Sequence, residues 1–132
     1  MTALEAYESG LALYRGDYLE GAFEGDWGSL DRTRLRSSFV RASLRAAALR
    51  MGLGDFDAAL RWARGALLAD DLAEAGYRMQ ALVYLRQEDR AAARASLASG
   101  MKRLVDAGLD PDAETRRIAQ RLGLGREAYP GG

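Results

Sequence analysis

The chain has 132 residues, enough for one domain with a sizeable core, and its 19 basic and 19 acidic side chains sum to a net charge of zero. A zero balance argues against a general nucleic-acid binder, because such proteins draw their affinity from an excess of basic side chains. The absence of cysteine and histidine excludes disulfides, thiolate nucleophiles, histidine-based triads and nearly all zinc sites.

Charge is distributed unevenly along the chain. Residues 1–31 hold seven acidic side chains and one arginine, whereas residues 32–64 hold eight arginines and two acidic side chains. This switch predicts that the two segments pack together or that one of them marks a partner surface. The N-terminus shows neither a long apolar run nor a signal-peptide pattern, so we expect a soluble, cytoplasmic protein with no membrane contact.

The first predicted helix begins at Thr2, where Thr2 and Glu5 have the spacing of a capping box. We expect it to stop at Gly16-Asp17. Three glycines between residues 16 and 26, separated by aromatic and aliphatic residues, then predict an irregular connector held by its aromatic side chains.

The stretch from Trp27 to Asp71 predicts a helical hairpin around which the rest of the chain is organised. Its long first helix carries two apolar stripes and a narrow polar line, which is typical of a helix packed on more than one side. That polar line consists of Arg34, Ser38, Arg41 and Arg45. The turn Gly52-Leu53-Gly54-Asp55 supplies a C-cap glycine and then an N-cap aspartate for the second helix.

Three more helices are expected after this hairpin, followed by a disordered tail over residues 125–132. No strand pattern occurs, so the predicted fold is all-α with about six helices, and residues 1–124 form the domain. We expect the three helices to run from Asp70 to about Gln87, from Glu88 to Gly108, and from Asp110 as N-cap to Gly123.

The hairpins repeat along the chain. Gly54-Asp55-Phe56 aligns with Glu88-Asp89-Arg90, which lies 34 residues later, and small residues recur at the pairs Ala47/Ala81 and Ala59/Ala93. A spacing of 34 residues is the tetratricopeptide period, in which small residues let the helices approach closely. We therefore expect tetratricopeptide-like stacked hairpins, whose concave side would accept a peptide, a subunit or a ligand.

Five motifs then occur in a characteristic order. They are Gly16-Asp17-Tyr18-Leu19; Trp27 with Arg32 and Leu35; Gly54-Asp55-Phe56 with Ala59-Leu60; Leu72, Glu74 and Tyr77-Arg78-Met79; and Gly108-Leu109-Asp110-Pro111 with Glu114-Thr115. Over roughly residues 4–122 this set resembles the bacterial transcriptional activator domain of antibiotic-regulatory-type activators. The resemblance implies an α-helical tetratricopeptide-like array that follows a winged-helix DNA-binding domain. It also implies roles in oligomerisation, in contacts with the transcription machinery and in the response to signals.

The chain departs from the family pattern in three respects. Gln87-Glu88 stands where the family favours glycine, and Leu97 stands near its usual tyrosine. No DNA-binding domain precedes residue 1, so we expect a domain excised from a longer regulator, the alternative being a stand-alone module. DNA would then be bound only by a separate domain.

Trp27, Arg32 and Leu35, which belong to one family motif, have two interpretations. In the structural one, which we favour, Trp27 caps the core at the helix start and Arg32 pairs with an acidic residue of the N-terminal segment. In the other, the motif contacts a ligand.

The candidate partner-binding residues are basic and aromatic. The arginine line could be a partner surface or a phosphate contact, although such a line is more often a solvated helix edge. The full set of candidates is Arg34, Arg41, Arg45, Tyr77, Arg78 and Tyr84.

No catalytic residue, metal site or cofactor is expected. The carboxylates cluster at two predicted helix N-termini, at Asp70-Asp71-Glu74 and at Asp110, Asp112 and Glu114, where acidic side chains cap free amides. Neither cluster has the spacing of a calcium loop, and Gly52-Leu53-Gly54 is too short to cradle a phosphate. These residues therefore predict no enzyme.

The sequence favours a protein–protein interaction or oligomerisation domain of a bacterial transcriptional regulator that acts without catalysis. Its partner would be the transcription machinery or a second copy of the chain. A stand-alone tetratricopeptide-type adaptor or chaperone module that binds peptide segments is the alternative, and a small-molecule sensor is a third hypothesis.

Overall fold

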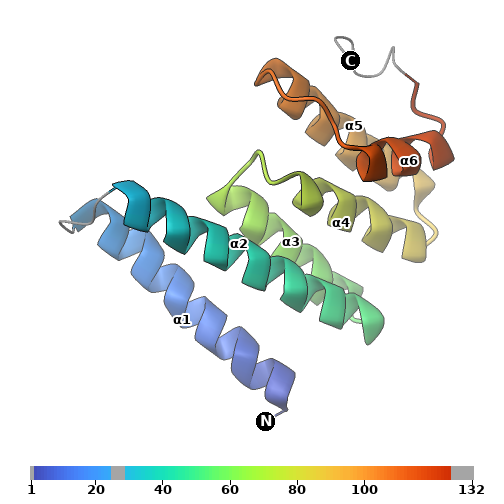
Figure 1. The fold of residues 1–132 in the computed structure, drawn as a ribbon. Helices are drawn as coiled ribbons and strands as arrows, with labels where there is room; N and C mark the ends of the chain where they lie inside the picture. The colour runs from blue at the N-terminus through green and yellow to red at the C-terminus, as the bar shows by residue number, and fades with distance from the viewer. Residues whose placement is uncertain (1, 25–28, 126–132) are drawn as a thin grey trace. The chain divides into compact units, whose positions relative to one another are not determined.

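The computed structural model of the chain describes residues 2–24 and 29–125, with side chains for residues 2–13 and 32–125. Within these residues the chain forms six α-helices and no strand, which confirms the predicted all-α fold (Figure 1). The chain divides between Asp70 and Asp71 into two compact units. In Figure 1 the first unit contains α1 to α3, in blue to green, and the second contains α4 to α6, in yellow to red.

In the first unit, α1 (Ala3–Glu24) packs against α2 (Ser29–Gly52). The predicted capping box is present, because the Thr2 hydroxyl accepts from the Glu5 N–H at 3.1 Å and the Glu5 carboxylate accepts from the Thr2 N–H at 3.2 Å. The predicted stop at Gly16-Asp17 is wrong, since α1 continues to Glu24. A glycine costs a helix interior only about 1 kcal/mol, which the neighbouring helix-forming residues can offset. Residues 25 and 26 of the predicted connector lie outside the described residues.

The hairpin of α2 and α3 (Phe56–Ala69) forms as predicted. Gly54 has φ +81°, and the Asp55 carboxylate accepts from the Ala58 N–H at 3.2 Å, so this turn ends one helix and caps the next. The residues buried in both helices are mostly small, which lets the two backbones approach closely. The most fully enclosed are Phe39, Ser43, Ala46, Ala47, Ala59, Ala63 and Ala66.

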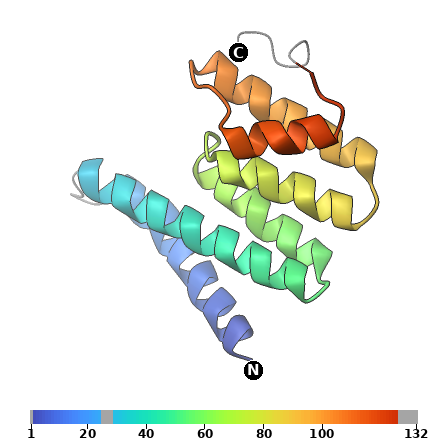
Figure 2. The same ribbon diagram turned by 45° about the vertical axis from the view of Figure 1, so that its right-hand side comes forward.

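In the second unit, α4 (Glu74–Arg86) and α5 (Arg90–Asp106) form a second hairpin, and α6 (Ala113–Arg121) packs against both (Figure 2). Asp89 caps α5 by accepting from the Ala92 N–H at 3.0 Å, and Gly108 follows α5 at φ +82°. These helices enclose one apolar cluster. Its buried members are Ala81, Ala93, Leu97, Met101, Ile118, Ala119, Leu122 and Leu124.

Two predicted helix starts in the second unit are wrong. α4 begins at Glu74, and its N-cap residue is Ala73, which makes no side-chain capping hydrogen bond. α6 begins at Ala113, because Asp112 rather than Asp110 accepts the Thr115 N–H, at 2.9 Å. Pro111 is buried before the helix starts, so the chain turns into α6 two residues later than the sequence suggested.

The 34-residue repeat is confirmed in the backbone of the two turns. Glu88 adopts φ +60°, the same left-handed region as Gly54, although it is not a glycine. The paired alanines Ala47/Ala81 and Ala59/Ala93 all have no exposed surface. The two hairpins therefore use the same helix-packing positions.

Candidate functional site

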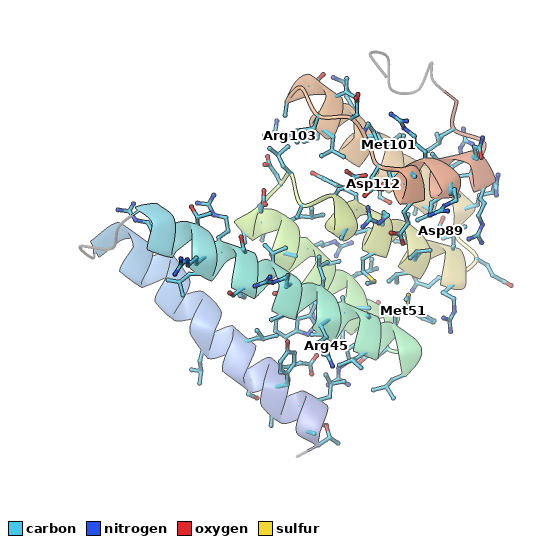
Figure 3. All side chains as sticks on the ribbon, viewed as in Figure 1. Arg45, Met51, Asp89, Met101, Arg103 and Asp112 are labelled. Atoms are coloured by element: carbon cyan, nitrogen blue, oxygen red, sulfur yellow. The ribbon has the colours of Figure 1, made fainter. Side chains whose placement is uncertain are left out.

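Three of the predicted partner-binding arginines lie together on α2. Arg34, Arg41 and Arg45 are exposed, and among the described residues none of them forms an ion pair or a hydrogen bond. Their spacing places them along one edge of the helix together with Ser38. Within the side chains that the structure describes, α2 therefore presents a line of positive charges without partners, which includes Arg45 in Figure 3.

An apolar groove of about 410 Å³ runs beside this line, between α1 and α2. Ser38 belongs to both features, because it lies on the arginine line and also lines the groove. The Tyr7 hydroxyl donates to the Ala42 carbonyl at 3.2 Å across the groove. The residues that line it are Ala6, Tyr7, Gly10, Leu11, Ser38, Phe39 and Ala42.

A polar cluster of Glu8, Arg50 and Trp62 ties α1 to the α2–α3 hairpin. The Glu8 carboxylate accepts from Arg50 Nε at 2.9 Å and from Trp62 Nε1 at 2.6 Å, and Arg50 Nη2 donates to its second oxygen. The Arg50 guanidinium holds the pKa of Glu8 below its ordinary value, and the Trp62 hydrogen bond acts in the same direction, against the effect of partial burial. α1 is therefore anchored by a charged group that is largely shielded from water.

No motif or spacing in the sequence singles out Glu8, Arg50 or Trp62. The signal that pointed towards them was the switch from acidic residues 1–31 to basic residues 32–64, which predicted that these segments pack together. The Glu8–Arg50 ion pair confirms that prediction for this pair. The hydrogen bond from Trp62 of α3 could not be predicted from the sequence, because Trp62 lies 54 residues from Glu8.

Arg78, a candidate on α4, is largely shielded and contacts several groups within the second unit. Its Nη1 lies 2.9 Å from the Asp112 carboxylate and 3.0 Å from the Thr115 hydroxyl. Glu74 joins the same network by accepting from the Asp112 N–H at 2.7 Å and from the Thr115 hydroxyl. Arg78 and Glu74 thus connect α4 to the start of α6, where Asp112 is labelled in Figure 3.

Tyr77 and Tyr84, the other two candidates on α4, also have contacts within the second unit. The Tyr77 hydroxyl donates to the Asp71 carbonyl at 2.7 Å, and its ring lies against Gly100 of α5 so closely that a Cβ at position 100 would come within 2.2 Å of its Cγ. Tyr84 is half-buried against the apolar cluster of this unit. The structure therefore places the candidates in two separate groups, three arginines on α2 and three residues on α4.

The residues of the tryptophan motif are only partly described. Trp27 lies outside the described residues, so its predicted capping role stays a prediction. Arg32 is exposed at the start of α2, and Leu35 is half-buried three residues further on.

The described part of the chain offers no arrangement of acidic side chains suited to a metal ion. Asp112 and Glu74 instead contact Arg78 and Thr115. None of the helices within residues 2–24 and 29–125 combines the length and the apolar character that a membrane crossing requires.

Comparison with known proteins agrees with the motif order and the helical hairpins. The model of the bacterial transcriptional activator domain family matches residues 1–122 of the chain. No curated protein and no solved structure matches the chain. With nearly its whole length covered by that family model, the chain belongs to the bacterial transcriptional activator domain family.

Proposed function

We propose that this chain acts as the protein-interaction domain of a bacterial transcriptional regulator in the cytoplasm, that it works without catalysis, and that it binds the transcription machinery or a second copy of itself. The observation that carries this proposal is the line of Arg34, Arg41 and Arg45, which is exposed and has no partner among the described residues. Unpaired arginines on a rigid helix suit recognition of carboxylates, because the guanidinium forms paired hydrogen bonds with them.

The net charge of the chain and the apolar groove beside the arginine line favour a protein over DNA as the partner. The net charge of the chain is zero, which gives little of the electrostatic attraction that DNA binding needs. The apolar groove beside the line adds surface that a protein can bury but that a phosphate backbone does not use. DNA would be reached through a separate domain.

The experiment that tests this proposal is site-specific photo-crosslinking in bacterial cells. The chain would carry a photoreactive amino acid at position 41, or, as the matched control, at position 116, where Arg116 is an exposed arginine of α6. We expect position 41 to yield a defined adduct with an RNA polymerase subunit or with a second copy, and position 116 to yield none.

Two outcomes would contradict the proposal. No protein adduct at position 41, or the same adducts at both positions, would remove the interaction surface from α2. Adducts with many unrelated proteins that share a short peptide would instead favour the adaptor hypothesis.

A further inference from the structure

We propose that the groove between α1 and α2 binds an acidic amphipathic segment of a partner protein, with apolar side chains in the groove and carboxylates on Arg41 and Arg45. This inference rests on the proposed function, because it names the chemistry of the partner that the α2 surface would recognise. It depends on the position of Ser38, through which the arginine line forms one rim of the groove.

The groove has the size and lining of a binding site for apolar side chains. Its volume of about 410 Å³ lies within the range of about 300–1,000 Å³ that is usual for ligand pockets. Alanine, glycine, leucine and phenylalanine supply most of the lining, so an apolar group would enter without stripping water from charged residues. Gly10 leaves part of this space open, since nothing lies within 4 Å of a Cβ built there.

Charge complementarity specifies the rest of the partner. Arg41 and Arg45 lie about one and two turns beyond Ser38 on the same edge of α2, and neither is paired among the described residues. On the α1 side, the Glu8 carboxylate is already bound to Arg50 and Trp62, so it does not neutralise them. A partner with carboxylates beside its apolar residues would supply the missing charge and gain orientation from it.

An amphipathic helix meets both requirements. Apolar residues at helical spacing would enter the groove, while acidic residues one turn away would meet the arginines. A nucleic acid would meet the arginines but not the apolar groove, and an uncharged apolar helix would leave the arginines without partners.

The test uses three synthetic peptides, each labelled with fluorescein and titrated with the 132-residue chain in fluorescence-anisotropy measurements. The first has leucine and phenylalanine at helical spacing and glutamate elsewhere. The second keeps the glutamates but replaces the apolar residues by serine, and the third keeps the apolar residues but replaces glutamate by lysine. We expect only the first peptide to bind, and to bind more weakly at high salt.

Two variants locate the binding. Gly10→Leu fills the open part of the groove and Arg41→Glu with Arg45→Glu reverses the rim charge; each should weaken binding of the first peptide by about tenfold or more. Gly52→Leu, which adds the same side chain at an open glycine outside the groove lining, and Arg116→Glu with Arg117→Glu, which reverses two exposed charges on α6, are the matched controls and should leave binding unchanged. Circular dichroism of every variant checks that the helices remain.

The inference is overturned if the first peptide does not bind, if the serine or lysine peptide binds equally well, or if Gly10→Leu has no effect. Sedimentation velocity measures whether the chain forms a dimer. If it does, and if Gly10→Leu dissociates that dimer, the groove is occupied by a second copy of the chain. If the position-41 crosslink persists in the Gly10→Leu chain, the interaction function stands and the groove assignment fails. If the chain that keeps Gly10 gives no crosslink from position 41, the proposed function itself is contradicted.

Discussion

The first unit, residues 1–70, and the second, residues 71–132, place their arginines in different surroundings. In the second unit, Arg78 contacts Glu74, Asp112 and Thr115 and so connects α4 to the start of α6, and Arg103 of α5 pairs with Asp71, which lies before α4. In the first unit, Arg50 does the same through Glu8, but Arg41 and Arg45 remain unpaired among the described residues. This difference is the reason we propose the first unit for recognition, because charges held in internal networks are costly to redirect.

Glycine is also used differently in the two units. Gly100 is in close contact with the Tyr77 ring, whereas Gly10 lines an open groove in which nothing lies within 4 Å of an added Cβ. Replacing glycine by alanine at each position therefore distinguishes the tightly packed α4–α5 pair from the partly open α1–α2 pair.

The largest expected effect is that of Gly100→Ala. Its new Cβ would lie 2.2 Å from Tyr77 Cγ, so we expect a loss of about 3 kcal/mol in the unfolding free energy, at the upper end of ordinary overpacking. Urea denaturation followed by circular dichroism measures it. Gly10→Ala is the matched control and should instead stabilise the chain by about 0.5–1 kcal/mol, since alanine is the better helix former.

A double-mutant cycle checks the cause of that loss. In a Tyr77→Ala background, where the ring is absent, Gly100→Ala should cost much less. An equal loss of unfolding free energy in both backgrounds would mean that the Tyr77 ring does not cause the destabilisation by Gly100→Ala.

The next effect concerns Glu8, which anchors α1. Glu8→Gln should cost the first unit about 2 kcal/mol, because hydrogen bonds to a charged group contribute about 1.5–3 kcal/mol. Tryptophan fluorescence during denaturation measures it, since both tryptophans lie in residues 1–70. Glu88→Gln, at an exposed position of the second unit, is the control and should leave this transition unchanged.

The same carboxylate predicts a pH dependence. Because the folded-state pKa of Glu8 is lowered from 4.5, its contribution to stability is complete above that pH and is lost as the pH falls through the folded-state value. We expect the unmodified chain to lose stability more steeply below pH 4.5 than Glu8→Gln does. Equal acid profiles for the two chains would show that another group dominates.

Ser43→Ala should have a smaller, opposite effect. The Ser43 hydroxyl is fully buried on α2 and has no hydrogen-bond partner among residues 2–13 and 32–125, so replacing it removes the cost of an unsatisfied polar group. We expect a gain of about 1–2 kcal/mol in the first unit, measured by the same fluorescence transition. A loss instead would mean that the hydroxyl finds a partner.

The smallest effect is expected at the second-unit turn. Glu88 has φ +60°, and glycine adopts this conformation without strain, so Glu88→Gly should stabilise the second unit by about 0.5–1 kcal/mol. Hydrogen exchange of α4 and α5 measures it. Glu88→Ala, which keeps the Cβ and therefore the strain, is the control and should give no comparable gain.

The turns and caps could be predicted from particular residues because their chemistry is local. Gly54-Asp55 and Asp89 act within a few residues of their own positions, and so does the Thr2–Glu5 capping box. The end of α1 could not be predicted, because glycines 16 and 21 only weaken a helix, and its neighbours decide whether it continues. Asp110 and Asp112 are equally suitable N-cap residues in the sequence. In the structure Asp112 caps α6, and Pro111 is buried directly before it.

The candidate site was predicted only in part, for a related reason. Helical spacing places Arg34, Arg41 and Arg45 on one edge of α2 whatever surrounds that helix. Whether an arginine on a helix is free or paired depends on residues far away in the chain. Arg78 looked like a surface residue until Asp112 and Thr115, 34 and 37 residues later, came within hydrogen-bonding distance.

By itself, the sequence determined the helical class, the 34-residue repeat, the family and the arginine line, since each follows from local spacing, motif order and helix periodicity. Only the tertiary structure decided which charges are paired, that Glu8 joins Arg50 and Trp62, and that a groove opens beside Ser38. Those features depend on the packing of side chains from separate helices, and no periodicity within one helix specifies which side chain of another will meet it.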